Sequence, residues 1–416
     1  MKAERELQPI VDTNQSYWQL AVIQLVGWTS LPILATSILV LQTNSLLGAA
    51  FTIVVGNAIL WFIRLGIVSM SYKKRQSTLD LAREYLGKFG GYCIAILLLL
   101  STFAWFIAQT SAASSTLTHL ILIHESPDID QFVQVSVVLG LMSTLLCMEG
   151  IVWLRRLSTI CFPILLLSFF MILYDAPHGL AQNTNALSLS GLSLVLATNL
   201  GITPDMPTFF RHSHSWLDSI KGLTITQLVS LIFGLLSLYL GSFVNGLFEI
   251  NESFLLHEAG SILRSSLIIF VFVSAICANV ANVYSASVGW EVIAPKSLVG
   301  RKEYLLLGLT LTILFIFFSG IFSPLYLLHT SDAALVNFCL VLTFAFLIVK
   351  YSGKTPSPAQ QVGYFLAWGL STAINVFQLA HEPETTSLPL LTSLGVVLGI
   401  MGMAVAPEVG RRFKGR

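Results

Sequence analysis

Apolar residues dominate this chain in long runs, each separated from the next by a short polar segment. A helix needs about 20 apolar residues to cross the hydrocarbon core of a bilayer. Runs near that length occur at residues 18–41, 46–70, 91–123, 132–148, 157–174, 189–210, 223–247, 261–290, 303–322, 331–349, 359–380 and 388–406. The pattern predicts an all-α integral membrane protein with twelve transmembrane helices.

Helix-breaking residues interrupt the first and the sixth of these runs. The first carries Gly27 and Pro32 near its middle, and the sixth carries Gly201, Pro204 and Pro207. Gly and Pro are common in membrane helices, so harmless kinks are one interpretation. Two broken spans at matching positions of two halves are instead typical of an inverted-repeat transporter that binds substrate between the breaks. We therefore expect a five-plus-five repeat of helices 1–5 and 6–10, with two appended helices.

The same map divides the chain into four parts. We expect a cytoplasmic tail over 1–17, the transport core over 18–350, helices 11 and 12 within 351–406, and a second tail over 407–416. Between helices 2 and 3, residues 76–87 predict a short amphipathic helix, with Ser77 or Thr78 as its N-cap and Gly87 or Gly90 as its end.

Charged residues indicate the orientation. All but two of the 22 Lys and Arg residues lie in the tails and in alternate loops, the exceptions being Arg64 and Arg264. The opposite loops carry acidic residues instead. By the positive-inside rule, the protein is expected in the cell membrane with both termini cytoplasmic. One missed or invented helix would scramble this alternation, so it supports the count of twelve.

Composition excludes several functional classes. The chain is 55% hydrophobic and 10% charged, against about 25% charged in soluble domains. A net charge of +1 indicates no nucleic-acid partner. Without HExxH, GxSxG or clustered His and Asp, we expect neither an enzyme nor a cofactor. The five cysteines, in or beside apolar runs and without a CxxC pair, indicate buried thiols rather than disulfides or zinc. The expected partners are a small-molecule substrate and the bilayer, in a monomer or weak homo-oligomer.

Short motifs in a consistent order carry a resemblance to a known family. These are Val55-Gly56-Asn57, Ser77-Thr78 with Ala82-Arg83, Trp105, Asp205 to Arg211, and Asn282 with Ser285-Ala286-Ser287. Over roughly residues 18–350 they resemble the nucleobase–cation symporter family, and within it bacterial cytosine permease. The resemblance implies a permease in which substrate lies between the breaks of helices 1 and 6 and the faces of helices 3 and 8.

A flat, neutral heterocycle needs aromatic surfaces and in-plane hydrogen-bonding groups. At the positions that the resemblance implies, the candidates are Trp28 and Trp105 for stacking, with Thr102, Gln109, Asn199, Thr203 and Asn282 for polar contacts. Cytosine permeases carry a glutamine where this chain has Thr102. Gln109, one helical turn after Trp105, is more similar to the hydantoin-carrying branch of the family.

The coupling ion is either sodium or a proton, if there is coupling at all. Sodium-using members of the family place a pair of hydroxyls on helix 8, where this chain has Cys277 and Ala278. A hard cation prefers several oxygen ligands, so the tentative ion site is limited to Gly27, Ser30, Ser274 and Asn279.

Ionisable residues inside the bilayer are functional suspects, and the sequence places none at the midplane. Asp205 is expected to pair with Arg211 or Arg64 near the inner face, and Asp332 to lie at an outer helix end. This absence of a central charge favours a neutral substrate. Two alternatives remain open: an amino-acid or amine permease of the same fold, and a ligand-sensing receptor built on it.

Overall fold

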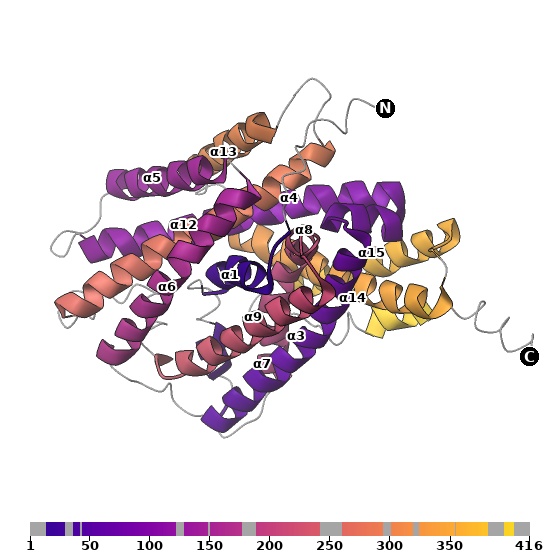
Figure 1. The fold of residues 1–416 in the computed structure, drawn as a ribbon, viewed down its shortest axis with the longest axis horizontal. Helices are drawn as coiled ribbons and strands as arrows, with labels where there is room; N and C mark the ends of the chain where they lie inside the picture. The colour runs from indigo at the N-terminus through magenta and orange to yellow at the C-terminus, as the bar shows by residue number, and fades with distance from the viewer. Residues whose placement is uncertain are drawn as a thin grey trace, which may run out of the picture.

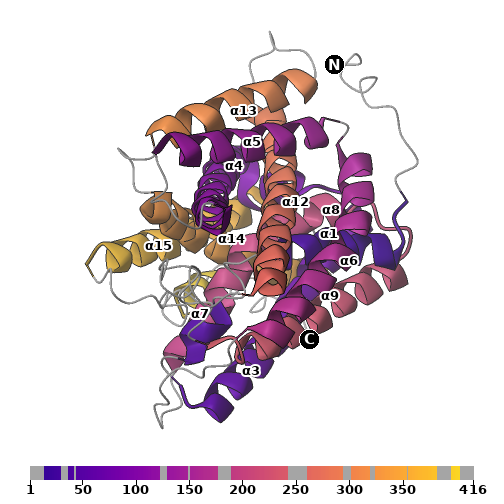
Figure 2. The same cartoon turned by 90° about the vertical axis from the view of Figure 1, so that its left-hand side faces the viewer.

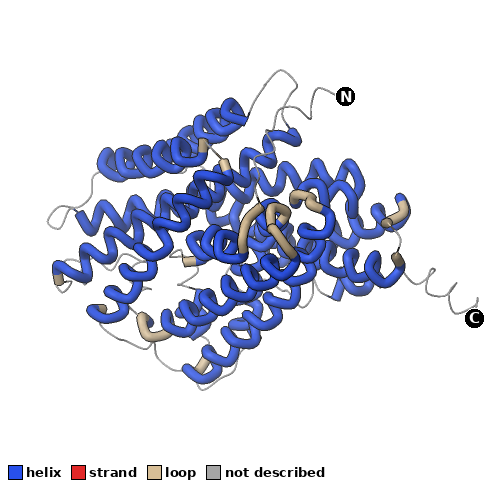
Figure 3. Tube along the Cα trace, in the orientation of Figure 1, coloured by secondary structure: helices blue, strands red, loops and turns tan. Residues whose placement is uncertain are grey.

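The computed structural model describes most of the predicted membrane-spanning segments. The described residues are 14–29, 36–41, 44–121, 129–148, 150–176, 189–241, 260–293, 301–318, 324–353, 355–381 and 395–402. Helices joined by short loops account for nearly all of them, and Figure 3 draws no strand in these ranges. Both predicted tails lie outside the described residues, apart from positions 14–17.

The helices coincide with the predicted apolar runs, and Figure 1 shows how they pack. In chain order they are α1 (Tyr17–Trp28), α3 (Leu46–Lys74), α4 (Thr78–Ile121), α5 (Ile129–Cys147), α6 (Ile151–Asp175), α7 (Leu189–Ile202), η2 (Thr203–Asp205), α8 (Met206–Phe210), α9 (Trp216–Ser237), α12 (Ser261–Ile293), α13 (Arg301–Phe318), α14 (Pro324–Ser352) and α15 (Pro358–His381). Residues 36–41 and 395–402 are also helical.

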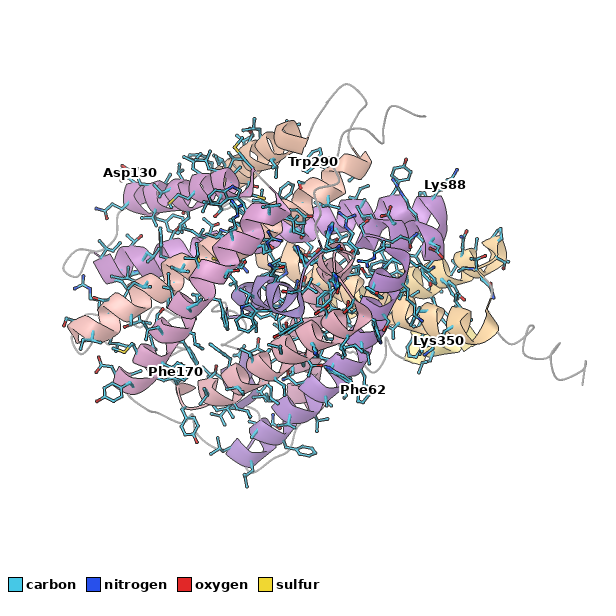
Figure 4. The ribbon with its side chains drawn as sticks, in the orientation of Figure 1. Phe62, Lys88, Asp130, Phe170, Trp290 and Lys350 are labelled. Atoms are coloured by element: carbon cyan, nitrogen blue, oxygen red, sulfur yellow. The ribbon has the colours of Figure 1, made fainter. Side chains whose placement is uncertain are left out.

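The outer surface of the bundle is suited to lipid. Within the described residues, seven helices are long and apolar enough to cross a membrane. Large apolar side chains are exposed on them, among them Phe62 and Phe170, which point away from the bundle in Figure 4. Exposed apolar surface on this scale is not tolerated in water, so the chain is a multi-pass membrane protein. Lys88 and Lys350 lie at one end of the bundle, and Asp130 lies at the other (Figure 4).

Helix packing shows the inverted repeat directly. Exchanging α1 with α7–α8, α3 with α9, α4 with α12, α5 with α13, and α6 with α14 reproduces the main contacts. Thus α1 packs on α6 and α9, while α7 packs on α14 and α3; α6 packs on α12, while α14 packs on α4. Helices α5 and α13 lie side by side at one edge, as Figure 2 shows. The predicted five-plus-five fold is confirmed.

The two predicted breaks differ in form. Helix α1 ends at Trp28, helical structure is described again from residue 36, and the intervening 30–35 lie outside the described residues. The second break is a single 3₁₀ turn, η2, between α7 and α8. Because Pro204 and Pro207 lack backbone N–H groups, an unbroken α-helical ladder cannot continue through this turn.

The predicted amphipathic helix forms the first two turns of α4. Ser77 is its N-cap: its hydroxyl accepts from the Asp80 backbone N–H at 3.3 Å, and its own N–H donates to the Asp80 carboxylate at 3.0 Å. Gly87, at φ 76°, ends it with a kink, after which the helix continues into the membrane span. Only Gly adopts that conformation without strain.

Candidate functional site

A cavity lies at the two helix breaks, bounded by α1, α4, α7 with η2, α12 and α14. It holds about 720 Å³ of empty space, part of it open to solvent. Six predicted residues line it: Gly27, Trp28, Thr102, Trp105, Gln109 and Asn282. The cavity therefore lies beside six of the residues that the sequence analysis named. Several other polar groups also line its wall.

Trp105 and Gln109 lie one turn apart on α4 and share the cavity face. The Gln109 Oε1 accepts from Asn282 Nδ2 of α12 at 3.3 Å, so these two amides are paired across the cavity wall. Each amide retains further donors and acceptors for a ligand. The Thr102 hydroxyl instead donates to the carbonyls of Leu98 and Leu99 of its own helix. It can therefore offer a ligand only its lone pairs.

Trp28 meets a buried cation on one face. The Arg64 guanidinium carbon lies 4.0 Å from the centre of the indole ring, a close cation–π contact. The predicted stacking of a ligand on Trp28 is therefore limited to the other face. The Trp28 Nε1 is buried and has no hydrogen-bond partner among the described residues. Trp28 therefore offers the cavity one N–H donor and the face of a ring that Arg64 holds in place.

Asn199 and Thr203 lie on the Arg64 side of the break. Arg64 donates from Nε to Thr203 Oγ1 at 3.0 Å and from Nη2 to the Asn199 carbonyl at 2.6 Å. The Asn199 side chain donates to the Val195 carbonyl and borders a separate space of about 360 Å³ that Trp28 also lines. Neither residue lines the main cavity, so the structure does not bring these two predicted ligands to the others.

Three ionisable side chains surround the break, whereas the sequence analysis expected none at the midplane and placed Asp205 near the inner face and Asp332 at an outer helix end. Arg64 is fully buried, and Asp332 is 8% exposed. Asp205, on η2, lines the cavity itself, and the Ser285 hydroxyl lies near its carboxyl group. The expected pairing of Asp205 with Arg64 or Arg211 is wrong: Arg64 bonds to Thr203, Gln227 and the Asn199 carbonyl, and no ion pair of Asp205 is found within the described ranges.

Asp332 was misplaced for a simple reason. The apolar run begins at residue 331, so the sequence predicts Asp332 at the end of a helix. In the structure, α14 begins earlier, at Pro324. Its carboxyl group consequently lies about two turns inside the helix, where it accepts from Trp105 Nε1 at 3.1 Å and from Ser101 Oγ at 3.4 Å. Ser101, Gln24 and Phe209 also line the cavity and were not predicted as site residues; Phe209 lies within the Asp205 to Arg211 motif, whereas no motif marks Ser101 or Gln24.

Protein hydroxyls and a thiol satisfy the carbonyls at the second break. The Ser71 hydroxyl of α3 donates to the Pro207 carbonyl at 2.8 Å, and the Thr78 hydroxyl of α4 donates to the Pro204 carbonyl. The Cys339 thiol lies 3.9 Å from the Leu200 carbonyl, which the missing N–H of Pro204 leaves without its helical partner. Of these three carbonyls, only that of Leu200 loses its helical donor to a proline, and it lies against the Cys339 thiol.

The tentative ion site is only partly brought together. Gly27 lines the cavity, Ser274 is buried, and Ser30 lies outside the described residues. Asn279 donates from Nδ2 to Thr110 Oγ1 of α4 at 2.8 Å, which leaves its buried Oδ1 without a partner among the described residues. The Cys277 thiol lies against Cys161 of α6. No group of three or more His, Cys, Asp or Glu able to hold a metal occurs in the described part.

Solved structures of transporters share this architecture. One is Mhp1, a nucleobase-cation-symport-1 family transporter, in a closed conformation with bromovinylhydantoin bound: TM-score 0.69, 14% identity, covering 94% of this chain and 93% of that one. The inward-facing conformation of Mhp1 gives a TM-score of 0.66 at 14% identity, covering 98% and 95%. A Na⁺-coupled sialic acid symporter gives 0.65 at 12% identity, covering 97% and 93%.

This chain has the fold of those symporters. No protein-family model and no curated protein matches its sequence. The likeness is carried by the helix arrangement along nearly the whole chain, and at these identities it establishes the fold alone.

Proposed function

We propose that this protein is a secondary transporter of the nucleobase–cation symporter family that carries a small nitrogen heterocycle by alternating access. The observation that carries the proposal is the cavity itself. It lies at the breaks of an inverted-repeat fold and is walled by Trp28, Trp105, Gln109 and Asn282. In such folds the substrate site lies at the interface of the repeats, where discontinuous helices meet.

The chemistry of the wall supports a heterocycle with N–H groups. Trp105 offers a flat apolar surface, and the paired amides of Gln109 and Asn282 offer both donors and acceptors. Asp205 adds a carboxyl group without a cationic partner among the described residues. An ionised carboxylate only accepts hydrogen bonds, so we expect the ligand to present at least one N–H to it. Nucleobases and hydantoins both do. The order of Trp105 and Gln109 supports the hydantoin-carrying branch, and the order of motifs supports cytosine permease.

Asp205 also favours a second candidate, an amine permease of the same fold. A protonated amine would compensate the carboxylate charge directly, which a neutral heterocycle does not. A bulky aromatic wall on both sides of the cavity is less suited to a small aliphatic amine. A heterocycle permease should therefore prefer a flat, neutral ligand, whereas an amine permease should prefer a positively charged ligand that need not be flat.

Thermal denaturation of the purified protein with added ligands separates these candidates. The probes are cytosine, uracil, hydantoin, tyramine and a neutral amino acid, each with wild-type protein and with Asp205→Asn. We expect stabilisation by cytosine, uracil or hydantoin; a ligand at about 100 times its Kd stabilises by about 2.7 kcal/mol. Stabilisation by tyramine alone, lost in Asp205→Asn, would establish the amine permease instead.

Uptake into proteoliposomes then distinguishes a carrier from a ligand-sensing receptor. A carrier accumulates or exchanges the stabilising probe, whereas a receptor binds it without net movement. Both termini are proposed to be cytoplasmic, which is supported by the positions of Lys88 and Lys350 at one end of the bundle and of Asp130 at the other (Figure 4). Protease access to a C-terminal tag in right-side-out vesicles tests this orientation.

A further inference from the structure

A buried carboxyl group lies behind the cavity wall. Asp332 accepts hydrogen bonds at Oδ1 from Trp105 Nε1 and Ser101 Oγ, both on α4. Ser101, Trp105 and Leu335 border the cavity, and Asp332 does not. A ligand the size of a heterocycle therefore contacts the side chains in front of this carboxyl group and not the group itself.

No cation balances Asp332 within the described residues. Helix α4 presents Ser101 and Trp105 to it, and α7 presents the backbone of Gly201. Among the side chains that the structure describes, the titratable groups in this part of the bundle, on α14 or on the elements packed against it, are Arg64 on α3, Asp205 on η2, Cys339 on α14 and Tyr364 on α15. Arg64 is already held by Thr203, Gln227 and the Asn199 carbonyl. A buried carboxylate without a counter-charge is costly, and binding a proton removes that cost.

The carboxyl group also contacts the second helix break. A Cβ placed on Gly201 would lie 3.0 Å from Asp332 Cγ and 3.1 Å from Oδ2. The group is thus packed between the ring that faces the ligand and the end of α7 that must move in alternating access. Protonation would turn one oxygen from an acceptor into a donor and remove one negative charge. It would therefore change the Trp105 contact and the Gly201 contact at once.

We propose that Asp332 is a proton-binding site that couples transport through this cavity to a proton gradient. The proposal rests on the function proposed above. Binding forms one O–H bond on the carboxylate with a proton from the outer solution, and release on the inner side breaks that bond and restores the charge. Ser101 relays the proton, because its hydroxyl both borders the cavity and contacts Asp332, and a hydroxyl donates and accepts. Asp332 acts on the ligand through Trp105, as a positioning residue.

Infrared difference spectra of the reconstituted protein at acidic and alkaline pH test proton binding without requiring transport. Because Asp205 is a second buried carboxyl group, the spectra are recorded in Asp205→Asn protein, where we expect a carbonyl band from a protonated carboxyl group shielded from water that is lost when Asp332→Asn is added. Trp105→Phe should shift this band, because it keeps the aromatic ring and removes the Nε1 donor. Asp130→Asn, at an exposed position on α5, is the control and should leave it unchanged. A shielded band of the Asp205→Asn protein that persists in the double variant Asp205→Asn with Asp332→Asn would overturn the proposal whatever uptake shows.

Uptake of labelled cytosine and hydantoin, with choline replacing sodium, tests coupling. An inward proton gradient should stimulate wild-type uptake about fivefold or more, the lower end of usual coupling between two sites. Asp332→Asn should lose this stimulation and retain exchange of the probe at equal pH; an equally stimulated Asp332→Asn protein would overturn the coupling. If neither probe enters wild-type vesicles under any gradient while the infrared band behaves as expected, the transport function is refuted and the proton site is supported.

Discussion

Two buried charged regions flank the second helix break, and they are satisfied to very different degrees. On one side, Arg64 donates hydrogen bonds to Thr203, to Gln227 at 2.7 Å and to the Asn199 carbonyl, and its flat face covers Trp28. On the other side, Asp205 and Asp332 have no cationic partner among the described residues. Both regions bury charge in a membrane bundle, but Arg64 donates three hydrogen bonds and covers an aromatic ring, whereas Asp332 accepts two hydrogen bonds and Asp205 lies near one hydroxyl.

The difference separates structure from function. A buried charge held by several hydrogen bonds fixes the elements that supply its partners; Arg64 connects α3 to α7 and to α9. A buried charge with few hydrogen bonds is costly, and binding of a proton or a ligand can release that free energy. We therefore assign Arg64 to the scaffold of the break, and the two carboxyl groups to its transport cycle.

The largest effect is expected on the satisfied side, from Arg64→Met. The substitution keeps most of the apolar stem and leaves Gln227 Oε1 and Thr203 Oγ1 without their donor. Buried orphaned acceptors cost about 1–3 kcal/mol each, so we expect a loss of roughly 2–6 kcal/mol in stability. Thermal denaturation in detergent measures it. Arg64→Lys should recover only part of the loss, because an ammonium group cannot reproduce the guanidinium fork.

Lys88→Met is the matched control, since Lys88 is an exposed basic residue on α4 (Figure 4). It should change stability by less than about 0.5 kcal/mol. If Arg64→Met were as stable as this control, Arg64 would not belong to the scaffold. A functional role for Arg64, for example a contact with an anionic ligand, would then be the better interpretation.

The positions of the helices could be predicted from the sequence because they depend on the hydropathy and length of each local segment. Every described helix overlaps one of the twelve predicted runs, and the break at Gly201–Pro207 follows from the missing backbone donors of two prolines. Trp105 and Gln109 were placed on one face because their spacing is one helical turn. These features depend on neighbours within a few residues.

The surroundings of the buried charged residues could not be predicted from the sequence in this way. Arg64 stood out as one of two basic residues away from the basic loops, but its partners lie more than 130 residues further along the chain. Asn199 and Thr203 were predicted as ligands because they adjoin the break, and the rotation of α7 turns them toward Arg64 instead. Asp332 depended on where α14 begins, which apolar composition alone does not determine.

A smaller effect is expected on the unsatisfied side, from Trp105→Ala. Removing the ring should weaken binding of cytosine or hydantoin by roughly 1–3 kcal/mol, by analogy with base stacking on aromatic side chains. Isothermal titration measures it. Trp105→Phe should retain most of the affinity, since the stacking surface remains while the donor to Asp332 is lost.

Trp18→Ala is the control for that measurement, because Trp18 lies on α1 and is exposed. Affinity should be unchanged in this variant. Equal affinity in Trp105→Ala and wild type, in a correctly folded protein, would make Trp105 a packing residue and remove the link between the ligand and Asp332.

The smallest effect is expected from sodium. The position that would supply hydroxyls carries Cys277, whose thiol lies against Cys161, and Ala278; thiols are poor ligands for a hard cation. Replacing sodium by choline should therefore change ligand affinity less than about fivefold, which is about 1 kcal/mol of coupling. The buried Asn279 Oδ1 is the oxygen that could contradict this, because it has no partner among the described residues. A large sodium dependence that is reciprocal between ion and ligand, and that disappears in Asn279→Ala but not in Asp332→Asn, would place a sodium site on α12. The carboxyl groups would then be balanced by something other than the coupling ion.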